Sequence, residues 1–592
     1  MPRVMPAVDV VIVGMGWTGS IAARELADTG LRIVGLERGR FRDTSPDFAA
    51  PNTLDELRFN ARGEMFQDLS KETITFRNTP NETALPMRKL GAFLPGDGLG
   101  GAGLHWNGQH WRFLPTDFQL RSHYETRYGK DFIDGDLSIQ DWGVTYSDLE
   151  PHYDKFEYVC GTSGKAGNIA GKIQEGGNPF EGPRSRPYPN PAQAQPFSYT
   201  LFAKAARELG YKPFPQPSGN MSKAYTNPLG IRLGPCTYCG FCEWFGCGNY
   251  SKASPQTTIL PVLIRKSNFA VRDNSEVTRI NTDRSGKRAT GVTFVDTSGE
   301  EWEQPADLVI LSAFTVFNIQ LLLLSKIGQP YDPVANRGVI GRNFTHQTIS
   351  DALGFFDNKK FNFNPFIASG SIGMCIDEFN GDNFDHGPHG FVGGGYMGQV
   401  QTNGRPIQTT PVPPGTPKWG AAWKTAVRDN YLSTVKPGTG VHGSFYSYRD
   451  IYLDLDPTYR DRFGRPLMRM TVDFHDNEIK QNAFLTDRFA EIIKAMGARE
   501  VSKEYRKAPY DITDYQTTHV CGGAIMGADP TTSAINRYLQ SWDVPNLFVM
   551  GASAFPQNPG YNPTGTVCAL AYWSAAAIRN QYLKNPGPLV DA

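Results

Sequence analysis

The sequence predicts an α/β fold in which a Rossmann-like dinucleotide-binding domain is interleaved with an α+β substrate-binding domain. Three observations indicate this fold. A GxGxxG turn joins an apolar strand to a helix at the N-terminus. The chain ends in a strand, a Pro- and Gly-rich loop and a long apolar helix. Alternating short strands occupy much of residues 346–514. The 592 residues are also too many for one ordinary hydrophobic core.

The first element is the strand at 9–13, followed by Gly14, Gly16 and Gly19 and by a helix at 20–28. The first glycine permits a tight turn and the second lets the backbone approach a pyrophosphate. The third brings the helix onto the strand, and the phosphate lies at the helix N-terminus. We therefore expect a dinucleotide site here rather than a glycine-rich turn that binds nothing.

A second strand at 31–36 ends in Glu37. A carboxylate at this position accepts hydrogen bonds from ribose hydroxyls and repels a 2′-phosphate, which argues against NADP. Two further segments are predicted to contact the cofactor, one within 98–108 and one within 546–578. Their candidate contact residues are Gly100, Gly101, His105 and Asn107 in the first, and Gly551, Ala552, Asn562 and Thr564 in the second.

Four cysteines lie within twelve residues: Cys236, Cys239, Cys242 and Cys247. Thiolates at such spacing favour an iron–sulfur cluster, because each CxxC loop turns the backbone around one centre. A structural zinc site usually takes its ligands from two separated knuckles, and no His lies beside these cysteines. Disulfides or free thiols are the remaining alternative, and the sequence does not say which three of the four would bind a three-iron cluster.

Charge, apolar runs and the remaining motifs narrow the function classes. The chain has 59 Lys and Arg residues and 59 Asp and Glu residues, so no excess of positive charge indicates nucleic-acid binding. The apolar run at 319–324 is far shorter than the roughly 20 residues that span a bilayer. Because MPRVMPA leads straight into the first strand, we do not expect export through a signal peptide of its own. The sequence alone would place the protein in the cytoplasm.

His386 and His389, in DHGPHG, are interpreted as a solvated loop rather than a metal site.

The motifs resemble those of the glucose–methanol–choline (GMC) oxidoreductases, a flavoprotein family, along nearly the whole chain. The GG-containing loop near residue 100 and SAFTVFNIQLLLLSKIG at 312–328 match two family signatures, with Lys326 replacing a usual glycine. HVCGGAIMG and YNPTG match the segments of the catalytic pair, which makes His519 and Asn562 the candidates. The resemblance implies FAD as the cofactor, bound in a GMC and p-hydroxybenzoate hydroxylase-like architecture.

Within the family, GLHWNGQHWRF and the cysteine-rich insert are similar to membrane-associated bacterial dehydrogenases of the gluconate-oxidising type. This resemblance implies a [3Fe-4S] cluster, oxidation of D-gluconate to 2-keto-D-gluconate, and electron transfer to a multihaem cytochrome c subunit. It also implies a small partner that bears the export signal, and a location on the periplasmic face of the inner membrane, with membrane association through the partner only. Sorbitol, fructose, a glucoside or 2-ketogluconate are alternative substrates. An oxygen-using oxidase and a non-catalytic electron-transfer or scaffold subunit that binds FAD are the alternative functions.

The chemistry assigns roles to three residues. His519 is the expected base for the substrate hydroxyl proton, and Asn562 holds the substrate oxygen without titrating. His105 lies where some relatives join a histidine to the flavin 8α-methyl group, so we expect either a covalent histidyl flavin or a histidine packed over the ring. A carboxylate substrate needs a cation. The candidates in the cap are Arg405, Lys418, Lys424 and Arg449.

We expect a discontinuous FAD-binding domain at 1–345 and 515–592 and a substrate-binding cap at 346–514. The first includes the cysteine-rich insert at 232–256 and a Pro- and Tyr-rich excursion at 116–224, which could contact either domain or a partner subunit.

Overall fold

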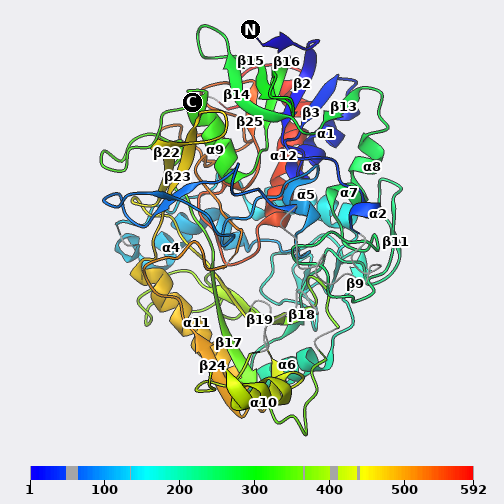
Figure 1. Cartoon of the computed structure of the whole chain (residues 1–592), viewed down its shortest axis with the longest axis vertical. Helices are drawn as coiled ribbons and strands as arrows, with labels where there is room; N and C mark the ends of the chain where they lie inside the picture. The colour runs from blue at the N-terminus through cyan, green and yellow to red at the C-terminus, as the bar shows by residue number, and fades with distance from the viewer. Residues whose placement is uncertain are drawn as a thin grey trace.

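The architecture was taken from a computed structural model (Figure 1). It describes residues 2–48, 65–133, 135–364, 367–400, 411–435, 440–515 and 517–590. Both ends of the chain lie near the larger sheet at the top of Figure 1, and a second sheet with its helices forms the lower half. The predicted α/β fold class is confirmed, because the chain forms one sheet with a parallel centre and a second, antiparallel sheet, with helices packed on both.

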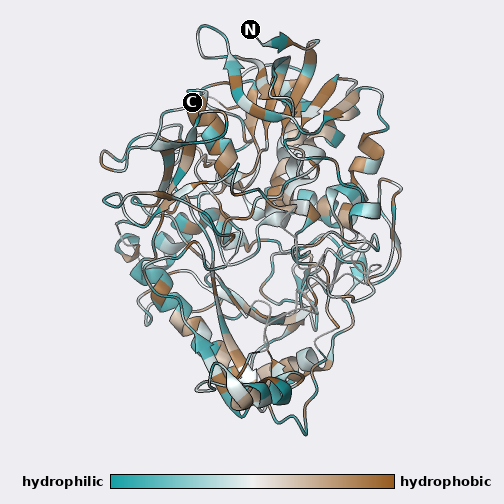
Figure 2. Cartoon of the chain, in the orientation of Figure 1, coloured by the Kyte–Doolittle hydropathy of each residue, from teal (hydrophilic) through white to brown (hydrophobic). Residues whose placement is uncertain are grey.

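The larger sheet has eight strands, in the order β13-β3-β2-β16-β15-β14, with β1 and β25 also paired to β16. Its centre is parallel, since β2 pairs parallel with both β3 and β16. Figure 2 shows hydrophobic residues concentrated in these central strands, as expected of strands covered on both faces. The strands are β1 (Arg3–Val4), β2 (Val8–Val13), β3 (Ile33–Leu36), β13 (Phe269–Arg272), β14 (Glu276–Thr282), β15 (Ala289–Val295), β16 (Glu301–Leu311) and β25 (Leu547–Val549).

Two helices run from this sheet toward the centre of the molecule. Helix α1 (Trp17–Ala27) follows β2 directly, and α12 (Thr564–Ala577) packs against it and against α5 (Tyr146–Cys160). Helix α12 is apolar nearly all round and largely buried, which is typical of a helix with neighbours on every side. The shorter helices of this half are α2 (Thr44–Asp47), α7 (Pro255–Thr258), α8 (Leu260–Leu263) and α9 (Thr315–Leu324).

The second sheet has seven strands, in the order β10-β18-β19-β21-β17-β20, with β24 paired to β17. Helix α11 (Asp476–Ala495) packs on β17, β21 and β24, and α6 (Phe197–Glu208) packs on β18 and α11. Helix α10 (Gly420–Asn430) lies at the bottom of Figure 1. The strands are β10 (Phe214–Pro215), β17 (Thr348–Phe355), β18 (Gly373–Ile376), β19 (Gly395–Val400), β20 (Thr434–Val435), β21 (Val441–Gly443) and β24 (Glu500–Glu504).

A four-stranded sheet joins distant parts of the chain. Strand β23 (Pro466–Thr471) pairs antiparallel with β22 (Tyr452–Arg460) and parallel with β4 (Thr75–Arg77), which in turn pairs with β5 (Leu85–Pro86). An early segment therefore pairs with residues nearly 400 positions later. Strands from the two predicted domains, such as β4 and β23, therefore share a sheet. The domain boundaries predicted from the sequence stay a prediction.

The excursion at 116–224 contains more regular structure than its composition indicates. Helix α4 (Leu120–Tyr128) and α5 lie in its first half, and α6 in its second. Helix α5 packs on α12 and α6 packs on the second sheet, so the excursion contacts both halves of the protein. Its two-stranded ribbons and the one that follows it are β6 (Ser163–Gly164) with β9 (Asn190–Pro191), β7 (Asn168–Ile169) with β8 (Lys172–Ile173), and β11 (Tyr225–Thr226) with β12 (Arg232–Leu233).

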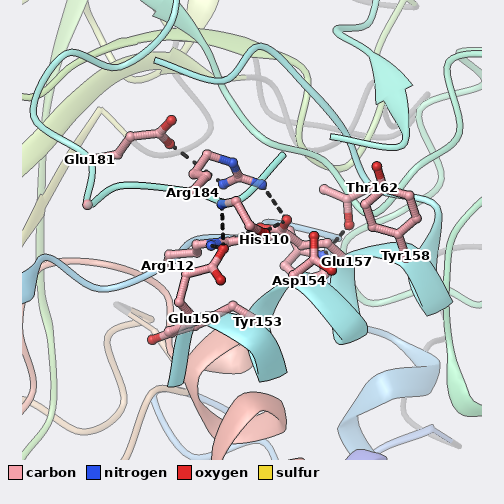
Figure 3. Close-up of polar contacts among 12 residues, drawn as sticks. His110, Arg112, Glu150, Tyr153, Asp154, Glu157, Tyr158, Thr162, Glu181 and Arg184 are labelled. Carbon is pink, nitrogen blue, oxygen red and sulfur yellow. Dashed lines mark hydrogen bonds and ion pairs between the residues drawn. The ribbon is translucent and has the colours of Figure 1, made fainter. Parts of the chain in front are cut away.

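A buried cluster of charges fastens α5 to a later part of the same excursion and to Arg112, which precedes it (Figure 3). Glu157, on α5, binds Arg112 and Arg184. Arg112 also contacts Glu150, and Arg184 lies 3.7 Å from Glu181. Because a buried charge without a partner is costly, these ion pairs hold the excursion in one arrangement.

The helices and strands predicted at both ends of the chain lie close to the observed ones. The DHGPHG loop differs from its interpretation, because His386 is buried. Its Nε2 lies 3.0 Å from the Gly381 carbonyl and 3.4 Å from Asp382. The loop folds back on α4, where the Tyr128 hydroxyl accepts a hydrogen bond from the His386 amide. In the described ranges, no helix has the length and apolar character needed to cross a bilayer.

Candidate functional site

A single long cavity connects the dinucleotide end of the protein to the second sheet. It has a volume of about 280 Å³. One end is lined by Gly14, Gly16 and Glu37, and the other by His519 and Asn562. A ligand that enters between the two sheets therefore contacts the fingerprint glycines and the predicted catalytic pair in the same cavity.

The three fingerprint glycines meet different steric demands. Gly14 has φ of +87°, and a Cβ atom there would lie 2.5 Å from the Ser312 carbonyl oxygen. A Cβ atom on Gly19 would lie 2.1 Å from the Gly14 oxygen, so this glycine permits close packing of α1. At Gly16 the nearest atoms would be 3.9 Å away, and the residue lines the cavity. These are the roles of a turn, a helix contact and a ligand approach that the sequence predicts.

Glu37 ends β3 at the cavity wall and is nearly inaccessible to solvent. One carboxylate oxygen accepts a hydrogen bond from the Met15 amide at 2.9 Å, and the other accepts one from Gly39 at 3.1 Å. Burial raises the pKa of Glu37 to about 7, against the lowering effect of these two amides. Each oxygen keeps lone-pair capacity for a ribose hydroxyl.

The other predicted cofactor residues lie near the same cavity. Gly101, Asn107, Gly551, Ala552 and Thr564 line it, and Gly100 and Gly101 have φ of +105° and +54°. Thr564 begins α12, so the positive end of that helix dipole faces the cavity.

His105 is buried at the cavity wall and its Nε2 has no hydrogen-bond partner among the described residues. Burial, together with the charge of nearby Lys252, lowers the pKa of His105 to about 3, so the ring is neutral. Trp17 also lines the cavity with an unpartnered ring nitrogen. Unpaired buried polar atoms of this kind indicate that the wall is shaped for a ligand with polar groups. The glycine cradle and these atoms fit a flavin dinucleotide.

His519 and Asn562 are brought together from segments 43 residues apart. Asn562 Nδ2 lies 3.3 Å from His519 Nε2, and Asn562 Oδ1 accepts a hydrogen bond from the Tyr396 hydroxyl at 2.9 Å. The His519 ring is half-buried with its free edge at the cavity. Burial lowers the pKa of His519 well below its usual value, and the neighbouring His442 and His346 lower it further. His519 is therefore neutral and can accept a proton.

Sequence reasoning missed three polar residues beside this pair. Gln347 Oε1 lies 2.5 Å from His519 Nδ1 and 3.2 Å from His442 Nδ1. Gln109 Oε1 accepts a hydrogen bond from the Tyr396 hydroxyl at 2.6 Å. These contacts join residues 95 to 287 positions apart, so no local pattern could have indicated them.

Three of the four cations predicted for a carboxylate substrate do not line the cavity. Lys418 and Lys424 lie on or beside the exposed helix α10, and Arg449 donates to the carbonyl of Pro333. Arg405 lies outside the described residues. The cationic residues that do line the cavity are Arg38 and Arg465, which are paired with Glu72 and with Glu276 and Asp461.

The four clustered cysteines are free thiols next to the cavity. Sulfur atoms of three of them accept or share hydrogen bonds: Cys236 with the Tyr238 amide, Cys242 with Asn220, and Cys247 with the Lys252 amide, each at 3.4 Å. Within the part of the chain that the structure describes, no three His, Cys, Asp or Glu side chains are arranged to hold a metal ion. The sulfur atoms therefore have hydrogen-bond donors beside them, as the ligands of an iron–sulfur cluster do, but the side chains do not have the arrangement of a formed metal site.

Lys252 connects these cysteines to the cavity. Its ammonium group donates to the carbonyl oxygens of Trp106, Cys242 and Phe245 at 2.6 to 2.8 Å. Trp106 lines the cavity, as does Trp244 between the third and fourth cysteines. Burial raises the pKa of the Cys242 thiol well above its usual value and outweighs the positive charge of Lys252, which lowers that pKa.

Comparisons with known proteins identify the family. Models described as GMC oxidoreductase match residues 189–349 and 450–571. The chain is 54% identical to the gluconate 2-dehydrogenase flavoprotein of Pantoea cypripedii, over 99% of this chain and 95% of that protein. The chain belongs to the GMC oxidoreductase family. It is therefore an FAD-dependent oxidoreductase that acts on CH–OH groups, as the sequence predicted.

More distant relatives match nearly the whole chain. The fructose dehydrogenase large subunit of Gluconobacter japonicus is 25% identical over 97% of this chain and 98% of that protein. A crystal structure of pyridoxine 4-oxidase from Mesorbium loti superposes with a TM-score of 0.56 at 16% identity, covering 97% of this chain and 99% of that one. At this identity the likeness shows the fold.

Proposed function

We propose that the protein is a dehydrogenase that oxidises a secondary alcohol of a sugar acid or polyol. Its reaction is the oxidation of D-gluconate to 2-keto-D-gluconate. One observation carries the proposal: the cavity that contains the glycine cradle also contains the His519–Asn562 pair. The relative that is 54% identical over 99% of the chain is named a gluconate 2-dehydrogenase flavoprotein, which supports this substrate.

The pair can perform the protein's part of the oxidation. Removing two hydrogens from a carbinol means taking a proton from its hydroxyl and a hydride from its carbon. His519, held neutral, takes the hydroxyl proton at Nε2. Asn562, fixed between His519 and Tyr396, holds the substrate oxygen and orients the carbon. FAD bound in the same cavity supplies the acceptor for the hydride.

We also propose that His105 is the attachment point of a covalent flavin, with Nε2 as the bonding atom. Its unpartnered nitrogen at the cavity wall supports this role. Denaturing electrophoresis tests it: flavin fluorescence that stays with the polypeptide, and is lost in His105→Ala, is the expected result. Release of all flavin on denaturation would mean that the histidine only packs against the ring.

For electron transfer, we propose a [3Fe-4S] cluster at the four cysteines and a multihaem cytochrome c subunit as the acceptor. A small partner carrying the export signal would place the complex on the periplasmic face of the inner membrane. The support is the set of four free thiols, the amide and Asn220 contacts to sulfur, and their position beside the cavity. Iron and acid-labile sulfide analysis of anaerobically purified protein tests the cluster.

Dye-linked turnover tests the proposed reaction. The purified, anaerobically prepared protein is supplied with D-gluconate, sorbitol, glucose or 2-ketogluconate, and oxygen uptake is followed in parallel. Dye reduction by gluconate with negligible oxygen uptake is expected. Preference for a neutral polyol would change the substrate but keep the mechanism, and rapid oxygen uptake would identify an oxidase instead.

A further inference from the structure

The orientation of the Gln347 side chain is fixed by the backbone. Its Nε2 lies 2.5 Å from the carbonyl oxygen of Gly560, which can only accept a hydrogen bond. The amide nitrogen must therefore face Gly560, and Oε1 must face the two imidazoles of His519 and His442.

This orientation decides which nitrogen of each histidine carries the proton. Oε1 can only accept, so Nδ1 of both His519 and His442 must be the N–H donor. A neutral imidazole has a single N–H, and the pKa of each ring is held far below its usual value by burial. Nε2 of both rings therefore carries a lone pair: that of His519 faces Asn562 Nδ2 at 3.3 Å, and that of His442 has no partner among the described residues.

The lone pair on His442 Nε2 accepts no hydrogen bond in the described part of the structure. The residue is 1% exposed, it lines the cavity, and its Nε2 has no hydrogen-bond partner among the described residues. The ring cannot easily turn away. Its backbone belongs to β21, paired on both sides, and Tyr396 stacks on it with ring centroids 4.8 Å apart and an interplanar angle of 22°.

We propose that His442 is a substrate-binding residue: its Nε2 accepts a hydrogen bond from the hydroxyl on the carbon next to the oxidised carbon. Gln347 is the positioning residue that presents Nε2 of both His442 and His519 to the substrate. The inference rests on the proposed function and deepens it, because it defines the substrate as a compound with hydroxyls on neighbouring carbons.

The distance between the two rings supports neighbouring hydroxyls. The centroids of His442 and His519 are 6.4 Å apart, and both rings turn Nδ1 toward the same oxygen. Each hydrogen bond to a hydroxyl spans about 2.8 Å, and the oxygens of a gauche vicinal diol are separated by a similar length. A single carbinol could satisfy one of the two lone pairs, and a vicinal pair satisfies both.

A second orphan atom shows that this end of the cavity is built for neutral polar groups. Gln109 is 1% exposed and lines the cavity, and its Nε2 donor has no partner among the described residues. The cavity-lining cations, Arg38 and Arg465, are both paired with carboxylates. Hydroxyl recognition by an acceptor at His442 and a donor at Gln109 therefore sets specificity, because an unfilled buried polar group costs free energy.

The first test compares two substrates in two proteins. Flavin reduction by D-gluconate and by 3-deoxy-D-gluconate is measured in the wild type and in His442→Ala. We expect kcat/KM of the wild type to be about tenfold higher for gluconate than for the deoxy compound, and the ratio to fall to about one in the variant. A ratio that stays near tenfold would overturn the role of His442. Failure of the wild type to oxidise gluconate would overturn the proposed function instead.

The second test needs no substrate, so it decides the role of Gln347 whatever the enzyme oxidises. Nitrogen-15 NMR of labelled histidines in the flavin-loaded protein reports which ring nitrogen is protonated. The wild type is expected to show Nδ1–H at both His442 and His519, with assignment by single His→Gln variants. An Nε2–H tautomer at His442 in the wild type would contradict the inference.

Two variants of Gln347 form a matched pair. Both Gln347→Leu and Gln347→Glu lose the donor to Gly560, but only the carboxylate can still accept from the two imidazoles. We expect the Leu variant to lose the Nδ1–H tautomers and the Glu variant to keep them. The Glu variant should also show the acid limb of its pH–rate profile at higher pH, since a nearby negative charge raises the pKa of His519. Equal behaviour of the two variants would show a merely structural role.

Discussion

Glu157 holds Arg112 through two parallel hydrogen bonds, Nε to Oε1 and Nη2 to Oε2, each 2.8 Å long. The side chains are 0% and 3% exposed. Arg184 donates to the same carboxylate from the other side, so one buried negative charge faces two buried positive charges (Figure 3). The packing of α5 against Arg112 and Arg184 therefore depends mainly on the ionisation of Glu157, with Glu150 and Glu181 as further carboxylates beside the two arginines.

Replacing Glu157 with Gln is expected to destabilise the protein by about 3 kcal/mol or more, because it leaves two buried guanidinium groups with too little negative charge. Denaturant unfolding with intrinsic fluorescence measures the loss. Asp154→Asn is the matched control: it lies on the same helix and pairs with half-exposed Arg186, and such pairs contribute about 0–1 kcal/mol. Equal losses in the two variants would contradict a special role for the buried cluster.

Stability should fall in acid because of the same carboxylate. Burial by itself would raise the pKa of Glu157, but the charges of Arg112 and Arg184 outweigh it and lower the pKa from 4.5 to about 2. The folded state thus binds fewer protons, so this contribution is fully present above about pH 4.5 and is lost as the pH falls toward 2. It amounts to roughly 3 kcal/mol. Unfolding curves between pH 6 and 3 should show a smaller acid loss in Glu157→Gln than in the wild type.

Loss of the proposed base should slow the reductive step. His519→Ala is expected to reduce the rate of flavin reduction by about 10²- to 10⁴-fold while flavin content is retained, because the substrate hydroxyl then lacks a proton acceptor. Stopped-flow absorbance measures this rate. His389→Gln, a histidine outside the cavity lining, is the control and should react like the wild type.

The pH dependence of the wild type gives an independent check on His519. Since the pKa of His519 lies well below its usual value, the neutral base persists through neutral pH. The acid limb of kcat/KM should therefore lie below pH 6.5. A limb centred at or above 6.5 would mean that another group, or a solvated histidine, limits the reaction.

The cysteine cluster predicts a separation of two activities. Cys242→Ser is expected to lower iron content and electron transfer to an external acceptor, with little effect on flavin reduction by substrate. Cys375→Ser is the matched control, because Cys375 is also fully buried but lies in β18, outside the cysteine-rich insert. If both variants kept their iron content and acceptor activity, the cluster at Cys242 would be wrong.

Local pattern was sufficient where a short segment carries the whole signal. The strand, turn and helix around Gly14 to Gly19 lie close to their predicted positions, because the steric demands that the glycines meet are set within a few residues. The long apolar helix predicted at the end of the chain is observed as α12, since its apolar residues face the core. The burial of His386 was not predicted, because it depends on contact with α4, more than 250 residues earlier.

The sequence by itself determined the dinucleotide fingerprint, the family resemblance and the identity of His519 and Asn562, since each is encoded in a contiguous motif. Only the tertiary structure decided that Gln347, His442 and Gln109 stand beside that pair. Their hydrogen bonds join strands of the second sheet to distant loops, and the orientation of one amide follows from a single carbonyl at Gly560. Such contacts arise when distant strands pack, and no residue spacing along the chain records them.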